Sequence, residues 1–179
     1  MKLFVTGGTG FVGRYVTRGL AQMGHDVTVV TRSSKKDRES PGGISLVEGD
    51  PTKPGLWQER VAEHDVIINL AGAPIFTHWT RKAKQNILES RLPTTHNLVD
   101  ALAESKKESL LLSTSAVGYY GGHMDDEMLD ESSPAGDDFL AQVGLGGLHR
   151  GAGEEGGSEL VEVPVLVDQR DLGLGLVLS

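Results

Sequence analysis

Thr6-Gly7-Gly8-Thr9-Gly10-Phe11-Val12-Gly13 decides the fold of this chain, because it joins an apolar run at residues 3–5 to a helix-like segment that begins at residue 14. Its glycines give the spacing Gly-x-x-Gly-x-x-Gly on a strand-to-helix turn. A residue without a Cβ lets the backbone turn sharply and approach a pyrophosphate held at the helix N-terminus. Tight turns also use glycine for steric reasons alone, but a strand before the triplet and a helix after it favour nucleotide binding.

Length, charge and cysteine content limit the class of protein. The chain has 179 residues, enough for one principal domain with a sizeable core. It has no cysteine, which excludes disulfides, thiolate catalysis and cysteine-ligated metal, and its net charge of -8 argues against a nucleic-acid partner. No apolar run approaches the roughly 20 residues that span a bilayer, and no signal-peptide pattern precedes the first strand. We therefore expect a cytoplasmic protein with no membrane partner. The sequence does not indicate its oligomeric state.

The order of predicted elements is that of an α/β protein. A strand at residues 2–6, a helix at 14–24 and a β-branched strand at 26–31 form one βαβ unit of the size of a dinucleotide-binding half. Further strands are predicted at 44–47, 65–70 and 110–116, and helices at 56–62 and 79–104. Pro93 lies inside the last helix and predicts either a kink or a junction of two helices.

The residues after the second strand indicate which dinucleotide is bound. An acidic residue there would favour NAD, but this chain has Thr31-Arg32-Ser33-Ser34-Lys35-Lys36. A guanidinium, hydroxyls and ammonium groups suit a 2′-phosphate, so the segment favours NADP over NAD; the alternative is a solvated basic loop. Asp50 follows the third strand, where it either contacts the adenine edge or is a turn residue.

Small and hydroxyl side chains follow the later strands. Ala71-Gly72-Ala73 after the fourth strand lets the backbone pass close to a cofactor, and Gly72 has little other steric reason to be there. The fifth strand leaves Ser113, Thr114 and Ser115 at its carboxyl end, where ligands of open parallel sheets bind.

Several motifs together resemble the extended or atypical short-chain dehydrogenase/reductase superfamily, in particular its NAD-dependent epimerase/dehydratase and nucleoside-diphosphate-sugar epimerase-like members. They fall in the family's order over residues 1 to about 142. The matching segments are Gly7-Gly8-Thr9-Gly10-Phe11-Val12-Gly13, Thr31-Arg32-Ser33, Asn69-Leu70-Ala71-Gly72, His78-Trp79-Thr80, Glu89-Ser90-Arg91 and Ser113-Thr114-Ser115-Ala116-Val117-Gly118-Tyr119-Tyr120-Gly121.

The resemblance implies a Rossmann-type doubly wound parallel sheet over residues 1–142, NADP in its crevice and Ser115 at the active-site serine. Arg91 stands where many relatives carry asparagine. The superfamily's acid/base pair is Tyr-x-x-x-Lys, whose lysine lowers the pKa of the tyrosine. Leu140 and Gly144 would occupy those two positions here. Tyr119 and Tyr120 are the candidates for a substitute phenol, unless they are packing or rim residues, as loop tyrosines often are.

The expected site follows from these motifs. No metal site is expected: His78 and His123 are interpreted as surface histidines, and the acidic run at residues 125–131 as a solvated loop. Catalytic roles are assigned to Ser115 and Tyr119, and cofactor contacts to Gly7, Thr9, Gly10, Phe11, Val12, Gly13, Arg32, Ser33, Asp50, Leu70, Ala71, Gly72 and Ser113.

Residues 143–179 depart from the family pattern. Glycines crowd the segment where relatives carry a long helix, and each costs about 1 kcal/mol in a helix. We therefore expect an irregular glycine-rich tail that ends in a possible strand at 176–179. Gly144-Leu145-Gly146-Gly147 can be encoded by codons that read Asp-Trp-Glu-Ala one base later, so residues 144–173 are either a shifted reading frame or a flexible linker. The resemblance also implies a C-terminal substrate domain, which this chain would lack.

Two functions are consistent with the sequence. The first is an NADP-dependent oxidoreductase or epimerase-like protein that moves a hydride to or from a sugar nucleotide or small carbonyl substrate. The second is a non-catalytic NADP(H)-binding module, a redox sensor or regulator without the Tyr-x-x-x-Lys pair. A nucleoside triphosphate site is excluded, because the loop lacks the Gly-Lys-Ser/Thr ending of a P-loop.

Overall fold

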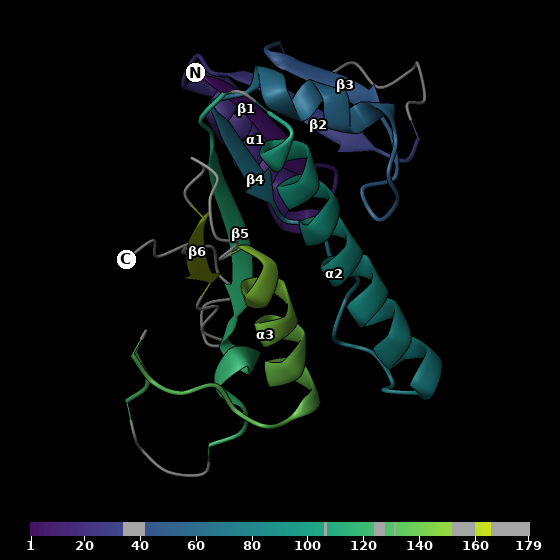
Figure 1. The fold of residues 1–179 in the computed structure, drawn as a ribbon, viewed down its shortest axis with the longest axis vertical. Coiled ribbons are helices and arrows are strands. Elements are labelled where there is room, and N and C mark those ends of the chain that lie inside the picture. The colour runs from purple at the N-terminus through teal and green to yellow at the C-terminus, as the bar shows by residue number, and fades with distance from the viewer. Residues whose placement is uncertain (34–41, 106, 124–127, 131, 152–159, 166–179) are drawn as a thin grey trace.

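The computed structural model describes residues 1–33, 42–105, 107–123, 128–130, 132–151 and 160–165. A parallel sheet of six strands in the order β3-β2-β1-β4-β5-β6 forms its centre (Figure 1). The strands are β1 Lys2–Thr6, β2 Asp26–Thr31, β3 Ile44–Glu48, β4 Val66–Asn69, β5 Leu110–Ala116 and β6 Leu160–Val165. The predicted doubly wound parallel sheet is confirmed.

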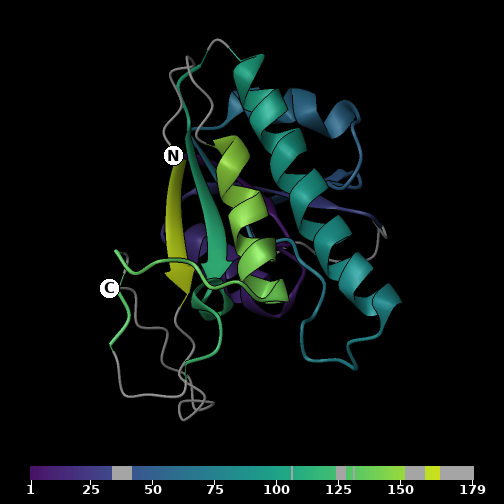
Figure 2. The ribbon, with the colours of Figure 1, turned by 60° about the horizontal axis from the view of Figure 1, so that its bottom comes forward.

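Helices cover the sheet on both faces. α2 (Arg81–Ala103) and α3 (Phe139–Gly151) lie side by side on one face, and α1 (Phe11–Gln22) lies on the other (Figure 2). The short helix η1 (Leu56–Glu63) packs against α2, and η2 (Val117–Tyr120) follows β5 and packs against α3. α2 continues through Pro93 as one helix, so the sequence's alternative of two helices is not realised.

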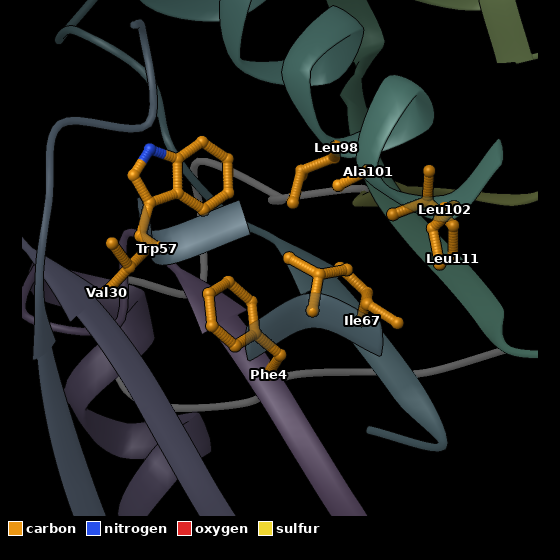
Figure 3. Close-up of a cluster of buried hydrophobic side chains, with 9 residues drawn as sticks. Phe4, Val30, Trp57, Ile67, Leu98, Ala101, Leu102 and Leu111 are labelled. Carbon is orange, nitrogen blue, oxygen red and sulfur yellow. The ribbon is translucent and has the colours of Figure 1, made fainter. Parts of the chain in front are cut away.

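The alternation of side chains along β1 explains the two cores. Leu3 and Val5 are buried on the α1 face, whereas Phe4 is buried on the α2 face. In the core on the α2 face, Phe4 contacts Trp57 of η1, and the cluster extends to Leu98 of α2 (Figure 3). Burial on both faces is why β1 and β2 read as continuous apolar runs.

Helix α3 corrects the prediction of an irregular segment from residue 143. The helix runs from Phe139 to Gly151 despite its glycines. A Cβ at Gly146 would lie 2.7 Å from Leu92 Cδ2, and one at Gly144 would lie 3.3 Å from Tyr119 Cδ2. Close packing against α2 and η2 therefore offsets the poor helix propensity of glycine. The strand predicted at 176–179 lies outside the described residues, and β6 lies within the segment assigned to a shifted frame.

The strand ends meet at one edge of the sheet and so position the candidate site. Thr6 at the end of β1 is in register with Asn69 at the end of β4, and Asn69 is in register with Ser113 of β5. This row lies immediately before the glycine turn on β1 and before the small residues that follow β4. Parallel pairing thus brings three motifs that are distant in the sequence to one crevice.

His64 is a buried histidine away from this edge. Its Nδ1 donates to the carbonyl oxygen of Arg60 (2.7 Å), so Nε2 accepts from the hydroxyl of Thr28 (2.8 Å). The ring meets the edge of Phe4 with 5.3 Å between ring centroids. Burial lowers the pKa of His64 below its ordinary value, although the hydrogen bond to Arg60 opposes this shift.

Acid is therefore expected to destabilise the fold through His64. The unfolded chain binds the proton first, so the stabilisation is complete above the ordinary pKa and is lost as the pH falls below about 6.5. Lowering the pH from 7.5 to 5.5 should reduce the free energy of unfolding by up to about 1 kcal/mol through this group. His64→Gln should remove that decrease in urea titrations, while His78→Gln, at an exposed position, should retain it. An unchanged pH dependence in His64→Gln would refute the assignment.

Candidate cofactor-binding site

Two positions of the glycine loop, Gly7 and Gly13, leave no room for a side chain. Gly7 has φ +68°, and a Cβ there would lie 2.5 Å from the carbonyl oxygen of Leu70. A Cβ at Gly13 would overlap the carbonyl oxygen of Gly7 and lie 2.6 Å from the Cα of Gly8. These distances show that the turn between β1 and α1 lies close to the backbone that follows β4.

The N-terminus of α1 presents unpaired amides beside this loop. Gly10 is the N-cap and supplies no side-chain cap, and the first helical hydrogen bond runs from Arg14 N to Gly10 O (3.2 Å). The amides of residues 11–13 therefore have no partner within the helix. The Phe11 side chain is 73% exposed and packs edge-on against Tyr15 of its own helix. Backbone amides, rather than the Phe11 side chain, suit a pyrophosphate here.

The predicted 2′-phosphate corner lies at the end of β2. Arg32 and Ser33 are exposed, and Ser33 donates from its amide to the Thr31 hydroxyl (3.5 Å). Burial raises the pKa of Asp50, but two hydrogen bonds from Thr52 and the charges of Lys53 and Arg32 hold it below its ordinary value. The Oδ1 atom of Asp50 accepts both Thr52 bonds, from the amide at 3.1 Å and the hydroxyl at 2.8 Å. Residues 34–41, with the two predicted lysines, lie outside the described residues.

Asn69 organises the floor of the crevice. Its Oδ1 accepts from the Thr6 hydroxyl (2.6 Å), and its Nδ2 donates to the hydroxyls of Thr95 and Ser113 (3.2 Å each). Its backbone carbonyl accepts from the Thr114 hydroxyl (2.9 Å). Asn69 is 5% exposed, so it ties β1, β4, β5 and α2 together through buried bonds. The sequence analysis assigned Asn69 no role. Its position directly after the apolar run Val66-Ile67-Ile68 could have indicated a buried polar residue at the end of this strand.

A cavity of about 400 Å³ opens above this floor. It brings together six residues that sequence reasoning assigned to the site, namely Leu70, Ala71, Gly72, Ser113, Ser115 and Tyr119. Leu140 and Gly144, at the positions of the family's acid/base pair, line the same cavity. The other predicted site residues are not among its lining residues, although Gly7 lies close to Leu70, which is; they are Gly7, Thr9, Gly10, Phe11, Val12, Gly13, Arg32, Ser33 and Asp50.

Arg91 is the cation in the cavity lining, and it gives Gly72 a steric role that the sequence did not reveal. Its Nη1 donates to the Ala73 carbonyl (3.0 Å), and burial lowers the pKa of its guanidinium. A Cβ at Gly72 would lie 2.7 Å from Arg91 Cζ. The prediction that Gly72 had little steric reason except a cofactor is therefore wrong: it makes room for the guanidinium.

The two histidines and the described part of the acidic run do not line this cavity. His78 is exposed, and His123 donates from Nε2 to the Tyr120 carbonyl (3.0 Å). Asp130 accepts from the amide and hydroxyl of Ser132, at 2.9 and 2.7 Å. Residues 124–127 and 131 lie outside the described residues.

The parallel sheet, the glycine turn after β1 and the cavity at the carboxyl ends of β4 and β5 define a dinucleotide-binding protein of Rossmann type. The chain belongs to the NAD dependent epimerase/dehydratase family, whose family model matches residues 3–138. The resemblance drawn from the sequence motifs is thereby confirmed.

Individual relatives agree with this placement. A chloroplastic epimerase family protein of Arabidopsis thaliana, an SDR39U1 homolog, is 36% identical over 152 residues, which are 80% of this chain and 42% of that protein. The human epimerase family protein SDR39U1, solved with NADPH, superposes with a TM-score of 0.71 at 26% identity over 92% of this chain and 53% of its own. A nucleoside-diphosphate sugar epimerase from Corynebacterium glutamicum gives 0.66 at 35% identity, over 84% of this chain and 30% of its own. The chain thus spans about half, or less, of these proteins.

Proposed function

We propose that this chain forms the cofactor-binding half of an NADP-dependent oxidoreductase or nucleoside-diphosphate-sugar epimerase-like protein, acting on a sugar nucleotide or small carbonyl substrate. The observation that carries the proposal is the shared cavity of the Ser115 and Tyr119 hydroxyls and the backbone of residues 70–72. The human relative solved with NADPH supports the choice of cofactor, and the Corynebacterium protein supports the reaction class.

The residues present fit a dinucleotide. A Cβ at Gly7 or Gly13 would collide with the backbone of the turn between β1 and α1. The amides at the start of α1 have no hydrogen-bond partner within the helix and are suited to a pyrophosphate. When bound, the nicotinamide supplies or accepts a hydride. On this proposal Ser115 donates a hydrogen bond to the substrate oxygen, and Tyr119 holds the proton that this oxygen gains or loses.

Arg32→Ala is expected to weaken NADPH binding about 10- to 100-fold, because a charge-assisted hydrogen bond to the 2′-phosphate contributes about 1.5–3 kcal/mol. NADH, which has no such phosphate, should bind unchanged. Fluorescence titration with NADPH and with NADH measures the ratio of the two affinities. Arg18→Ala, which removes an exposed arginine of α1, is the matched control and should leave both affinities unchanged. An unchanged NADPH-to-NADH ratio in Arg32→Ala would show that the corner does not bind the phosphate.

A non-catalytic NADP(H)-binding module is the second candidate. Leu140 and Gly144 in the cavity favour it, because neither can act as an acid or a base. Cofactor titration, combined with turnover assays on sugar nucleotides and small carbonyls, distinguishes the enzyme from the non-catalytic module. Tight NADPH binding without oxidation of NADPH by any substrate would support the module.

A further inference from the structure

Most polar groups around the cavity already have partners inside the protein. Asn69 bonds to Thr6, Thr95 and Ser113, and the Thr114 hydroxyl donates to the Asn69 carbonyl. These bonds fix the strand ends and use both amide hydrogens of Asn69.

Arg91 is committed through one of its three side-chain nitrogens. Its Nη1 donates to the Ala73 carbonyl at 3.0 Å, and it also approaches the Ile87 carbonyl and the Ser90 hydroxyl, at 3.4 Å each. The guanidinium therefore supports the loop after β4 on its Nη1 side.

Two hydroxyls of the cavity lining form no hydrogen bond within the part of the chain that the structure describes. Among the described residues, the structure gives the side-chain hydroxyls of Ser115 and Tyr119 no hydrogen bond, and both line the cavity. Two hydroxyl donors in one cavity suit an acceptor oxygen, as a carbonyl provides.

The rest of the wall is apolar. Ile75, Phe76, Leu140 and Val143 line the cavity, and Phe76 is 87% exposed. A Cβ at Gly118 would lie 2.9 Å from Leu140 Cβ, so Leu140 is packed against the turn after β5. A sugar ring against this wall would lose water from its hydroxyls without gaining partners, whereas an aromatic or branched aliphatic group would gain apolar burial.

We infer that the substrate is an apolar ketone or aldehyde, reduced to its alcohol, rather than a sugar nucleotide. The inference rests on the proposed function, whose substrate class it narrows. It places the carbonyl oxygen at Ser115 and Tyr119 and the apolar body against Ile75, Phe76 and Leu140.

Gly144 stands at the position where the family carries its lysine. A Cβ there would lie 3.3 Å from Tyr119 Cδ2, so the phenol ring lies against that position. In the reduction the Tyr119 phenol acts as the acid. The carbonyl carbon would gain the hydride that the reduced dinucleotide, when bound, supplies as it is oxidised, and the carbonyl π electrons would move to oxygen. That oxygen takes the Tyr119 proton, which water replaces.

Binding of defined probes to the full chain tests the substrate class. NADPH affinity is measured first by fluorescence. With NADP⁺ bound, saturation-transfer NMR then compares 4-nitrobenzaldehyde, D-glyceraldehyde and UDP-glucose, none of which can be reduced by the oxidised cofactor. The expected result is that 4-nitrobenzaldehyde binds at least about tenfold more tightly than either polar probe. Equal or tighter binding of UDP-glucose overturns the inference and leaves the proposed function standing, whereas absent NADPH binding overturns both.

Matched variants locate the apolar wall. Phe76→Ala and Leu140→Asn should weaken 4-nitrobenzaldehyde binding several-fold and leave NADPH affinity unchanged. Their controls are Leu56→Ala, at another exposed apolar residue (81% exposed), and Leu145→Asn, on α3 but absent from the cavity lining. Because Phe76 is exposed, its variant should fold even if Leu140→Asn does not. Unchanged probe binding in Phe76→Ala would show that the aldehyde lies elsewhere.

Oxidation of NADPH by 4-nitrobenzaldehyde tests the reduction. Tyr119→Phe should abolish it while NADPH affinity stays unchanged and aldehyde binding weakens only several-fold through the loss of one hydrogen bond, a split that a structural role for the ring would not give. Absence of NADPH oxidation at saturating aldehyde in the wild-type chain, or full activity in Tyr119→Phe, would overturn the assignment of the reaction.

Discussion

Gly13→Ala is expected to abolish NADPH binding at concentrations where the wild-type chain is saturated and to lower the free energy of unfolding by about 2–3 kcal/mol. The new methyl would overlap the Gly7 carbonyl oxygen and lie 2.6 Å from the Gly8 Cα. Both neighbours are backbone, so the turn itself must open. Because Gly7 also packs against the Leu70 carbonyl, opening the turn would move the loop away from the crevice. Fluorescence titration and urea unfolding measure the two effects.

Gly19→Ala is the matched control on the same helix. A Cβ at Gly19 would meet nothing within 4 Å, so alanine there should raise the free energy of unfolding by about 0.5–1 kcal/mol through helix propensity. NADPH affinity should be unchanged. Opposite signs for the two substitutions would confirm that the position of the glycine, rather than glycine content, matters. Wild-type NADPH affinity in Gly13→Ala would disprove the proposed role of the turn.

Asn69→Leu is expected to lower the free energy of unfolding by about 3 kcal/mol, because it leaves buried hydroxyls without partners. Thr6, Thr95 and Ser113 each bond to the Asn69 side chain, and leucine offers no donor or acceptor in its place. The loss should also weaken NADPH binding, since the same residue fixes the ends of β1, β4 and β5. Urea unfolding and cofactor titration of one preparation measure both.

Asn86→Leu is the control for this substitution. Asn86 lies on the exposed side of α2, so the same exchange should change the free energy of unfolding by no more than about 0.5 kcal/mol. A similar loss in both variants would show that the Asn69 network contributes nothing beyond an ordinary exchange of asparagine for leucine.

Two predictions failed for a common reason. Glycines at 144 and 146 predicted an irregular segment, yet they let α3 pack closely against Tyr119 and Leu92. Gly72 was interpreted as having little steric reason apart from a cofactor, yet it makes room for the Arg91 guanidinium. In each case the partner lies 18 residues or more away along the chain, so local propensity carried no information about it.

By itself, the sequence determined the family, the parallel α/β sheet and the glycine turn at residues 7–13, because apolar runs and glycine spacing act over a few neighbouring residues. Only the tertiary structure decided which residues share the cavity. Strand register placed Thr6, Asn69 and Ser113 in one row, and helix packing set Leu140 and Gly144 beside Tyr119. These are contacts between distant segments, fixed by close packing and by the need to satisfy buried polar groups, and no local pattern encodes them.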